Sequence, residues 1–176
     1  MLGYVTSEER GTVDRLLSEV ARVLSEQGWL LAGVVQENLE RASGGPCDMD
    51  LHVLATDHRI RISQNLGAMA QGCRLDPVGL EQAAGLVEQV LDGAGGARPR
   101  LLIVNKFGKQ EIEGRGFRPL IGRALMQDIP VLVAVNALNV RAFQDFAAGM
   151  GQSIEPSPEA ILHWANATQP VEIRGE

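Results

Sequence analysis

Several absences narrow the class of this protein. The sequence has two cysteines, Cys47 and Cys73, which is too few for a disulfide framework, and it has no CxxC pair to indicate structural zinc. No apolar run approaches the about 18 residues that a membrane span needs. The segment Met1–Val5 lacks a basic stretch followed by a long apolar one, so we expect no signal peptide and a cytoplasmic location.

The sequence also lacks the positive charge of a nucleic-acid-binding protein. Its net charge is −6 and its pI about 5.1, so non-specific binding to nucleic acid is disfavoured. The 176 residues, 45% of them hydrophobic, are sufficient for one globular domain with a sizeable core. We expect a single domain over residues 1–166 and a loose tail over residues 167–176.

Apolar runs alternate with amphipathic stretches along the chain. The runs at 2–5, 29–35, 101–104 and 130–135 predict buried strands. Apolar residues at helical spacing predict helices over 13–27, from Asp76-Pro77 onward, and over 119–127, 139–149 and 157–164. Residues 36–48 are interpreted as a loop, and 50–54 with 59–63 as a short β-hairpin insertion or an edge of the sheet. This order predicts a three-layer α/β fold with a mainly parallel sheet.

The stretch from residue 101 to residue 117 is the strongest candidate for a functional segment. A buried strand is expected to end at Val104 and to open into a charged loop that contains three glycines. Open α/β sheets place their ligand sites where such strands end. The basic residues Lys106, Lys109, Arg115 and Arg118 favour an anionic ligand or an acidic partner surface. Glu111 and Glu113 are weak candidates for a catalytic base, and a solvated surface loop is the alternative.

The turn after the first strand, residues 6–12, lacks the GxxxxGK[ST] pattern of a phosphate-binding loop. It has only Gly11, and its acids Glu8 and Glu9 would repel a phosphate. Thr6, Ser7, Arg10 and Thr12 could still bind an anion with the help of the helix dipole. The alternative is a plain helix cap in which Thr6 and Glu9 form a capping box.

The two cysteines are weak candidates for a metal site. Cys47 could meet Cys73, His52 or His58 around a soft metal, and Cys73 beside Arg74 could have a lowered pKa. The alternative is that both are small buried hydrophobic residues. We therefore assign no metal.

Residues 102–111 resemble the second nucleotide-binding motif of the small THEP-type nucleoside-triphosphatases. Gly108, Lys109 and Glu111 match, whereas Asn105 and Lys106 stand where that family has an acidic pair. Residues 105–111, 114–117 and 73–76 resemble more closely a bacterial domain family of unknown function that is encoded beside molybdenum-transport genes. The resemblance implies a P-loop-like fold with a degenerate phosphate-binding loop. It also implies a link to molybdate and a protein partner in molybdenum transport.

The leading hypothesis is a non-hydrolytic, P-loop-like domain that binds an anionic ligand, either a nucleotide or an oxyanion such as molybdate. The expected ligand-binding residues are Thr6, Ser7, Arg10, Gly11, Thr12, Asn105, Lys106, Gly108, Lys109 and Arg115. One alternative is an active nucleoside-triphosphatase in which Glu111 or Glu113 acts on water and Arg10 replaces the missing lysine. Another is a protein-interaction or regulatory module that uses residues 44–76 as its contact surface.

Overall fold

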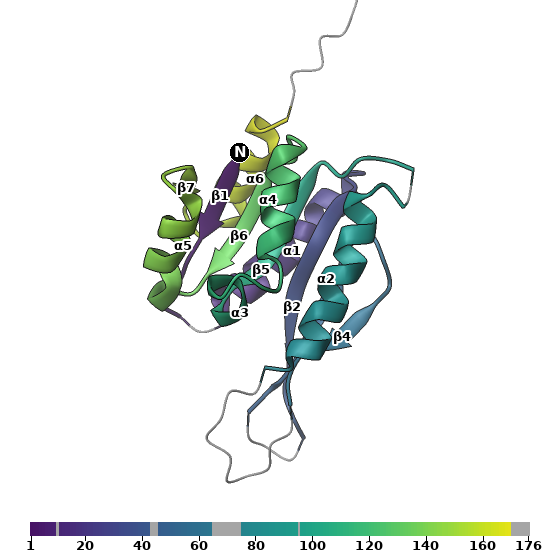
Figure 1. Cartoon of the computed structure of the whole chain (residues 1–176), viewed down its shortest axis with the longest axis vertical. Helices are drawn as coiled ribbons and strands as arrows, with labels where there is room; N and C mark the ends of the chain where they lie inside the picture. Colours follow the sequence, from purple (N-terminus) through teal and green to yellow (C-terminus); the bar gives the residue numbers. More distant parts are fainter. Residues whose placement is uncertain (10, 43–45, 65–74, 95, 170–176) are drawn as a thin grey trace, which may run out of the picture.

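The centre of the molecule is one seven-stranded sheet. The computed structural model describes residues 1–9, 11–42, 46–64, 75–94 and 96–169. The strands follow the order β4-β3-β2-β5-β6-β1-β7 across the sheet (Figure 1). They are β1 (Leu2–Val5), β2 (Leu31–Leu39), β3 (Asp48–Val53), β4 (Arg59–Arg61), β5 (Leu101–Phe107), β6 (Val131–Val135) and β7 (Gly151–Ser153).

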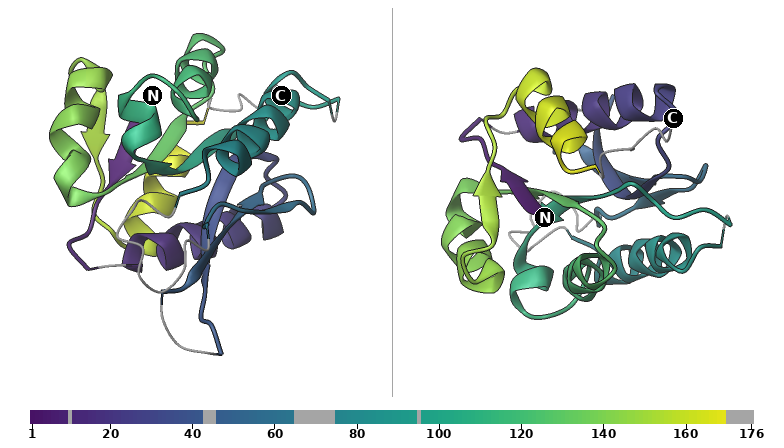
Figure 2. Two further views of the ribbon diagram at one scale, coloured as in Figure 1. Left: turned by 60° about the horizontal axis from the view of Figure 1, so that its bottom comes forward. Right: turned by 90° about the horizontal axis from the view of Figure 1, so that it is seen from above.

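Helices cover both faces of the sheet and give three layers (Figure 2). Helices α1 and α6 lie on one face, and α2, α4 and α5 lie on the other. The bounds are α1 (Thr12–Glu26), α2 (Pro77–Leu91), α3 (Lys109–Ile112), α4 (Arg118–Met126), η1 (Ala137–Asn139), α5 (Val140–Ala147) and α6 (Pro158–Ala167).

The middle of the sheet is parallel, as its apolar strands predict. Strands β2, β5, β6, β1 and β7 all run in one direction, and β3 and β4 join β2 as antiparallel partners. In β5, Leu101 and Ile103 pack on the α1 side, whereas Leu102 and Val104 pack on the α2 side. Both faces are therefore buried, which explains why these strands contain so few polar residues.

Strands extend further than predicted at two places where a loop was expected. Residues 36–48 were interpreted as a loop, but β2 continues to Leu39 and pairs with β3 from Val34↔Val53 to Leu39↔Asp48. Likewise β5 continues through Asn105 and Lys106 to Phe107. In both places a neighbouring strand satisfies the backbone hydrogen bonds, so polar side chains do not end the strand. Strand β7 was not predicted at all, because its three residues carry no apolar alternation.

Helix starts were predicted well where a side chain forms the cap. The carboxylate of Asp76 accepts from the Val78 N–H before α2, and the Ser157 hydroxyl accepts from the Ala160 N–H before α6. The proposed capping box of Thr6 and Glu9 is wrong, because α1 begins at Thr12 with Gly11 as its N-cap.

The C-terminal end of the described chain is attached to the domain. Helix α6 continues beyond the predicted end at residue 164 to Ala167, and the Gln169 side chain donates to the Arg100 carbonyl at 3.2 Å. Residues 170–176 of the expected tail lie outside the described part. Within the described ranges, no helix has the length and apolar character needed to cross a membrane.

Candidate functional site

A cleft of about 1140 Å³ lies at the edge of the sheet where β1, β2, β5 and β6 end. This is the carboxyl edge of the parallel strands, where open α/β sheets bind ligands. Its walls come from the turn before α1, the first turn of α1, the β2–β3 hairpin and the segment after β6. The lining residues are Ser7, Glu8, Glu9, Gly11, Val13, Asp14, Arg15, Gln36, Asn38, Glu40, Pro46, Cys47, Met49, Lys106, Ala134, Val135, Asn136, Ala137 and Leu138.

The N-terminus of α1 forms one wall of this cleft. Gly11 has a φ of 78°, a left-handed conformation that favours glycine, and no side chain of a described residue caps the helix. The first N–H groups of the helix therefore lack the side-chain acceptor that usually satisfies them. The Ser7 hydroxyl accepts from the Glu9 N–H at 3.1 Å, and the Thr6 hydroxyl is buried without a hydrogen bond to a described residue. Arg10 lies outside the described residues.

A β-bulge directs Lys106 into the cleft. The register of β5 against β6 shifts between Asn105 and Phe107, so Lys106 is an extra residue in the strand. Val104 and Phe107 consequently pack into the same core cluster on the α2 side although they are an odd number of positions apart. Lys106 is thereby turned toward α1, where its Nζ lies 3.2 Å from Oδ1 of Asp14.

Asp14 is the centre of a polar chain across the cleft floor. Its side chain is 7% exposed, against 38% for that of Lys106. Its second oxygen, Oδ2, accepts from Asn38 Nδ2 at 2.8 Å, and Asn38 Oδ1 accepts from Gln36 Nε2 at 2.8 Å. Both carboxylate oxygens of Asp14 are therefore occupied, and Lys106 is the member of the ion pair that faces the open space.

Asn105 is the most unusual polar residue near the cleft. It is 1% exposed, yet neither Oδ1 nor Nδ2 forms a hydrogen bond with a described residue. Asn105 lies opposite Ala134 in the neighbouring strand, and Ala134 lines the cleft. A buried amide without partners costs about 1–3 kcal/mol. Such a group needs an explanation, and a bound ligand is one.

The mouth of the cleft is acidic. Glu8, Glu9 and Glu40 line it as exposed side chains. Among the described lining residues, they and Asp14 give four acidic side chains against two basic ones, Arg15 and Lys106. The lining therefore differs from the basic pocket that the sequence suggested for an anion.

Cys47 and Met49 bring two sulfur atoms to the hairpin wall of the cleft. Cys73, the proposed partner of Cys47 in a metal site, lies outside the described residues. His52 Nε2 hydrogen-bonds with the Thr56 carbonyl at 3.2 Å within its own hairpin. Among the residues that the structure describes, no group of three or more His, Cys, Asp or Glu side chains could hold a metal ion.

The second half of the segment 101–117 builds a different feature. Glu111, 2% exposed, accepts from the Gly108 N–H at 2.9 Å and from the Phe117 N–H at 3.0 Å, one with each carboxylate oxygen. Gly116 leaves no room for a side chain, since a Cβ there would lie 2.1 Å from Glu111 Oε1. Burial raises the pKa of the Glu111 carboxyl, although the two N–H donors oppose the shift. We call this arrangement, Gly108 to Phe117, the Glu111 loop.

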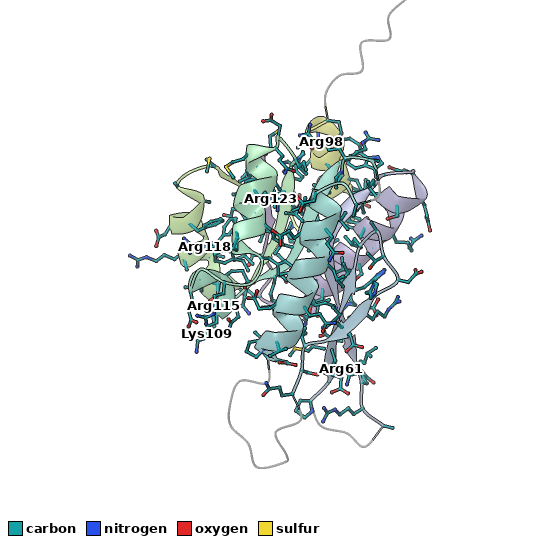
Figure 3. The ribbon with its side chains drawn as sticks, turned by 45° about the vertical axis from the view of Figure 1, so that its right-hand side comes forward. Arg61, Arg98, Lys109, Arg115, Arg118 and Arg123 are labelled. Atoms are coloured by element: carbon teal, nitrogen blue, oxygen red, sulfur yellow. The ribbon has the colours of Figure 1, made fainter. Side chains whose placement is uncertain are left out.

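The remaining predicted site residues lie on the surface of the Glu111 loop. Lys109 and Arg115 both pair with Glu113, the former at 3.9 Å, and Arg115 also donates to Gln110. Figure 3 shows Lys109 and Arg115 beside each other at the outside of the molecule. Neither they nor Gly108 line the cleft. The structure thus brings Lys106 together with Ser7 and Gly11, and separates Lys109 and Arg115 from them.

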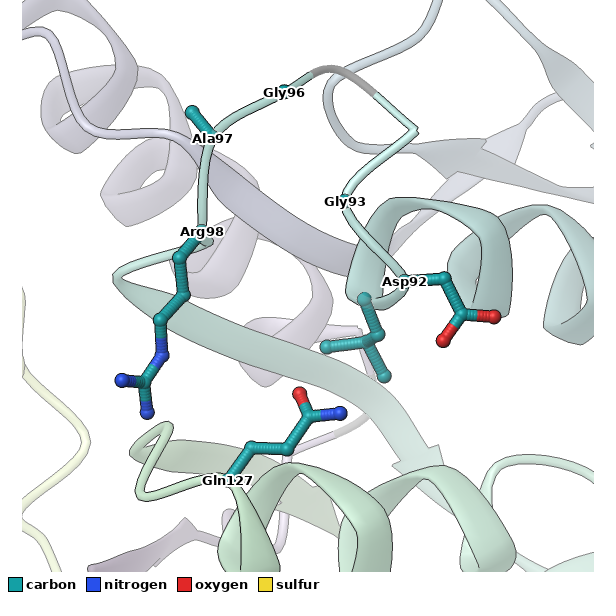
Figure 4. A pocket seen from close by; sticks show the side chains of 7 residues that line it. Asp92, Gly93, Gly96, Ala97, Arg98 and Gln127 are labelled. Atoms are coloured by element: carbon teal, nitrogen blue, oxygen red, sulfur yellow. The ribbon is translucent and has the colours of Figure 1, made fainter.

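A second hollow, of about 510 Å³, lies at the opposite edge of the sheet, between the end of α2 and the residues that precede β5 and β6 (Figure 4). Arg98 and Gln127 are among its lining residues. It is shallow and far from the carboxyl ends of the strands, so we do not regard it as the principal site.

Sequence reasoning missed Asp14, Gln36 and Asn38. Asp14 was hidden in the first turn of a helix, where an acidic residue is ordinary. Gln36 and Asn38 were expected in a loop. They alternate along the chain directly after an apolar strand, and this pattern is typical of a strand that continues with one face exposed to solvent.

The family model described as "Protein of unknown function (DUF2478)" matches residues 2–164 of this chain. The chain belongs to that family. The predicted resemblance to a bacterial family of unknown function is thus confirmed.

A relative and a solved structure extend this finding. The molybdenum import ATP-binding protein ModC 2 of Bradyrhizobium diazoefficiens is 35% identical over 156 residues, which cover 86% of this chain but only 16% of that protein. The crystal structure of THEP1 from the hyperthermophile Aquifex aeolicus superposes with a TM-score of 0.65 at 18% identity, covering 99% of this chain and 100% of that one. The predicted P-loop-NTPase-like α/β fold is therefore confirmed.

Proposed function

We propose that this member of the family binds a nucleotide in the cleft at the carboxyl edge of the sheet and does not hydrolyse it. The observation that carries the proposal is the convergence of three groups on one cleft of about 1140 Å³: the uncapped N-terminus of α1, the ammonium of Lys106 and the amides of Asn38 and Gln36. Helix N-termini and lysine bind phosphate, and amides can hydrogen-bond ribose or base.

The cleft favours a nucleotide over a small oxyanion such as molybdate. A nucleotide is large enough to fill a cleft of several hundred Å³, and only its phosphate part is charged. Of the side chains that the structure describes in the cleft, a free oxyanion would meet four carboxylates and two basic groups, one of them already paired with Asp14. We therefore propose a nucleotide, and molybdate binding is the alternative that the experiment below tests.

The residues at the end of β5 support the proposed lack of hydrolysis. A nucleotide hydrolase needs a carboxylate there to hold Mg²⁺ and a second group to orient the attacking water. Asn105 and Lys106 provide neither. Glu111, the nearest acidic candidate in sequence, has both oxygens occupied within the Glu111 loop, and Glu113 pairs with Arg115.

The relative named as a molybdenum import ATP-binding protein supports a role beside molybdenum uptake. That protein contains a segment similar to this chain as a small part of its length. We infer that the nucleotide-binding domain serves as an accessory or sensing unit for such a transporter, with an ATP-binding subunit as its protein partner.

Thermal shift with the purified chain tests the proposal directly. A ligand that binds only the folded state raises the melting temperature. We expect a rise with ADP and ATP, no rise with molybdate, tungstate or phosphate at equal concentration, and no phosphate release from ATP. Failure of every nucleotide to raise the melting temperature, with and without Mg²⁺, would overturn the proposal. Phosphate release that is lost in Glu111→Gln would favour the triphosphatase instead.

A further inference from the structure

The nucleotide-binding fold leads to the expectation of Mg²⁺ beside the phosphates, held by carboxylates at the end of a strand. The residues at the end of β5 do not fit that ion, although the exposed carboxylates of Glu8, Glu9 and Glu40 line the mouth of the cleft. The end of β5 offers an amide and an ammonium, and both oxygens of Asp14 are occupied by Lys106 and Asn38. We propose, on the basis of the proposed function, that Lys106 replaces the metal and that the cleft takes the metal-free nucleotide.

The geometry of the ion pair supports this assignment. Asp14, at 7% side-chain exposure, lies beneath Lys106, at 38%. Both residues line the cleft, and the positive end of the pair is the more exposed one. Asp14 lies on one side of the ammonium, which carries three N–H donors, so donors remain for phosphate oxygens.

The bulge in β5 fixes the position of that charge. In a regular strand the side chain after Asn105 would point to the α2 side, into the core cluster that holds Val104 and Phe107. The extra residue instead places the ammonium on the α1 side, within the same cleft as Gly11 and the N-terminus of the helix. A divalent cation placed there would lie next to a fixed ammonium and be repelled by it.

The acidic mouth predicts which nucleotide binds best without a metal. Glu8, Glu9 and Glu40 repel phosphate charge, and no Mg²⁺ is available to neutralise it. A nucleoside diphosphate carries less charge than a triphosphate. We therefore expect ADP to bind at least as tightly as ATP.

Calorimetric titration of the intact chain with ADP, in EDTA and in excess Mg²⁺, tests the inference. We expect the two dissociation constants to agree within about threefold, or binding to be weaker with Mg²⁺. Binding that is about tenfold or more tighter with Mg²⁺ would overturn the inference while leaving the proposed function intact. An absence of ADP binding in both buffers would overturn both.

The two lysines of the sequence give a matched pair of variants. Lys106→Met should weaken ADP binding in EDTA by about tenfold or more, because a charge-assisted hydrogen bond is lost. Lys109→Met should leave it unchanged, since Lys109 lies outside the cleft. Asp14→Asn/Lys106→Met removes both charges together and serves if the single variant does not fold. Equal affinities for Lys106→Met, or the double variant, and the unmodified chain would refute the role of Lys106.

Discussion

The two halves of the segment 101–117 are neighbours in sequence but differ in whether their buried polar groups have hydrogen-bond partners. At the end of β5, Asn105 is buried without a hydrogen bond to a described residue, and Lys106 faces an open cleft. In the Glu111 loop, the buried carboxylate has an N–H donor for each oxygen. A buried polar group with hydrogen-bond partners stabilises the fold, whereas one without partners needs another explanation, of which a bound ligand is one. The following experiments test whether this division is correct.

Glu111→Gln should have the largest effect on stability. The amide offers one acceptor oxygen and places an NH₂ group against either the Gly108 or the Phe117 N–H. We expect a loss of about 2 kcal/mol in the free energy of unfolding, measured by urea denaturation. ADP affinity should stay the same, because the Glu111 loop does not line the cleft. A loss of affinity with no loss of stability would reverse the assigned roles.

The cost of Glu111→Gln should also depend on pH. Burial raises the pKa of Glu111 in the folded protein above its unfolded value. The folded state then binds the proton more tightly, so the stability contributed by this proton is fully present below the usual glutamate range and is lost as pH rises through the folded pKa. The variant has no carboxyl at this position and does not gain this stability. The difference in unfolding free energy between the unmodified chain and the variant should therefore grow from neutral toward mildly acidic pH. A deficit that shrinks on acidification would contradict the raised pKa.

Asn105→Leu should shift stability and binding in opposite directions. Leucine has nearly the same shape and removes an amide whose atoms have no partner in the described structure. We expect a gain of about 1 kcal/mol in the free energy of unfolding together with weaker ADP binding. A loss of stability would show that the amide is satisfied in the free protein. Unchanged binding would remove Asn105 from the site.

Lys109→Met should have the smallest effect. Its side chain is 73% exposed, and its 3.9 Å pair with Glu113 is a surface contact. Such pairs contribute about 0.2–1 kcal/mol or nothing measurable. We expect the unfolding midpoint in urea to stay within experimental error of that of the unmodified chain. A clear drop would mean that Lys109 supports the Glu111 loop.

The parts of the fold that were predictable depend on local chemistry. A few adjacent residues are enough to predict such an element, as in the apolar run at Leu101–Val104 and the helix caps at Asp76 and Ser157. The parts that were not predictable depend on distant partners. The β2–β3 pairing carries polar residues into a strand, and the pairing of Asp14 with Lys106 joins residues from separate elements. The prediction that the basic residues form one ligand site was wrong for this reason. Their proximity in sequence did not reveal that the bulge turns Lys106 away from Lys109.

The bulge at Lys106 also has a consequence for how this protein can change. Val104 and Phe107, on either side of it, both belong to the core cluster on the α2 side, and Lys106 does not. A substitution at position 106, matched by one at Asp14, changes the charge offered to a ligand and leaves this apolar packing in place. The site can therefore be given a new specificity, by natural variation or by design, without rebuilding the scaffold that supports it.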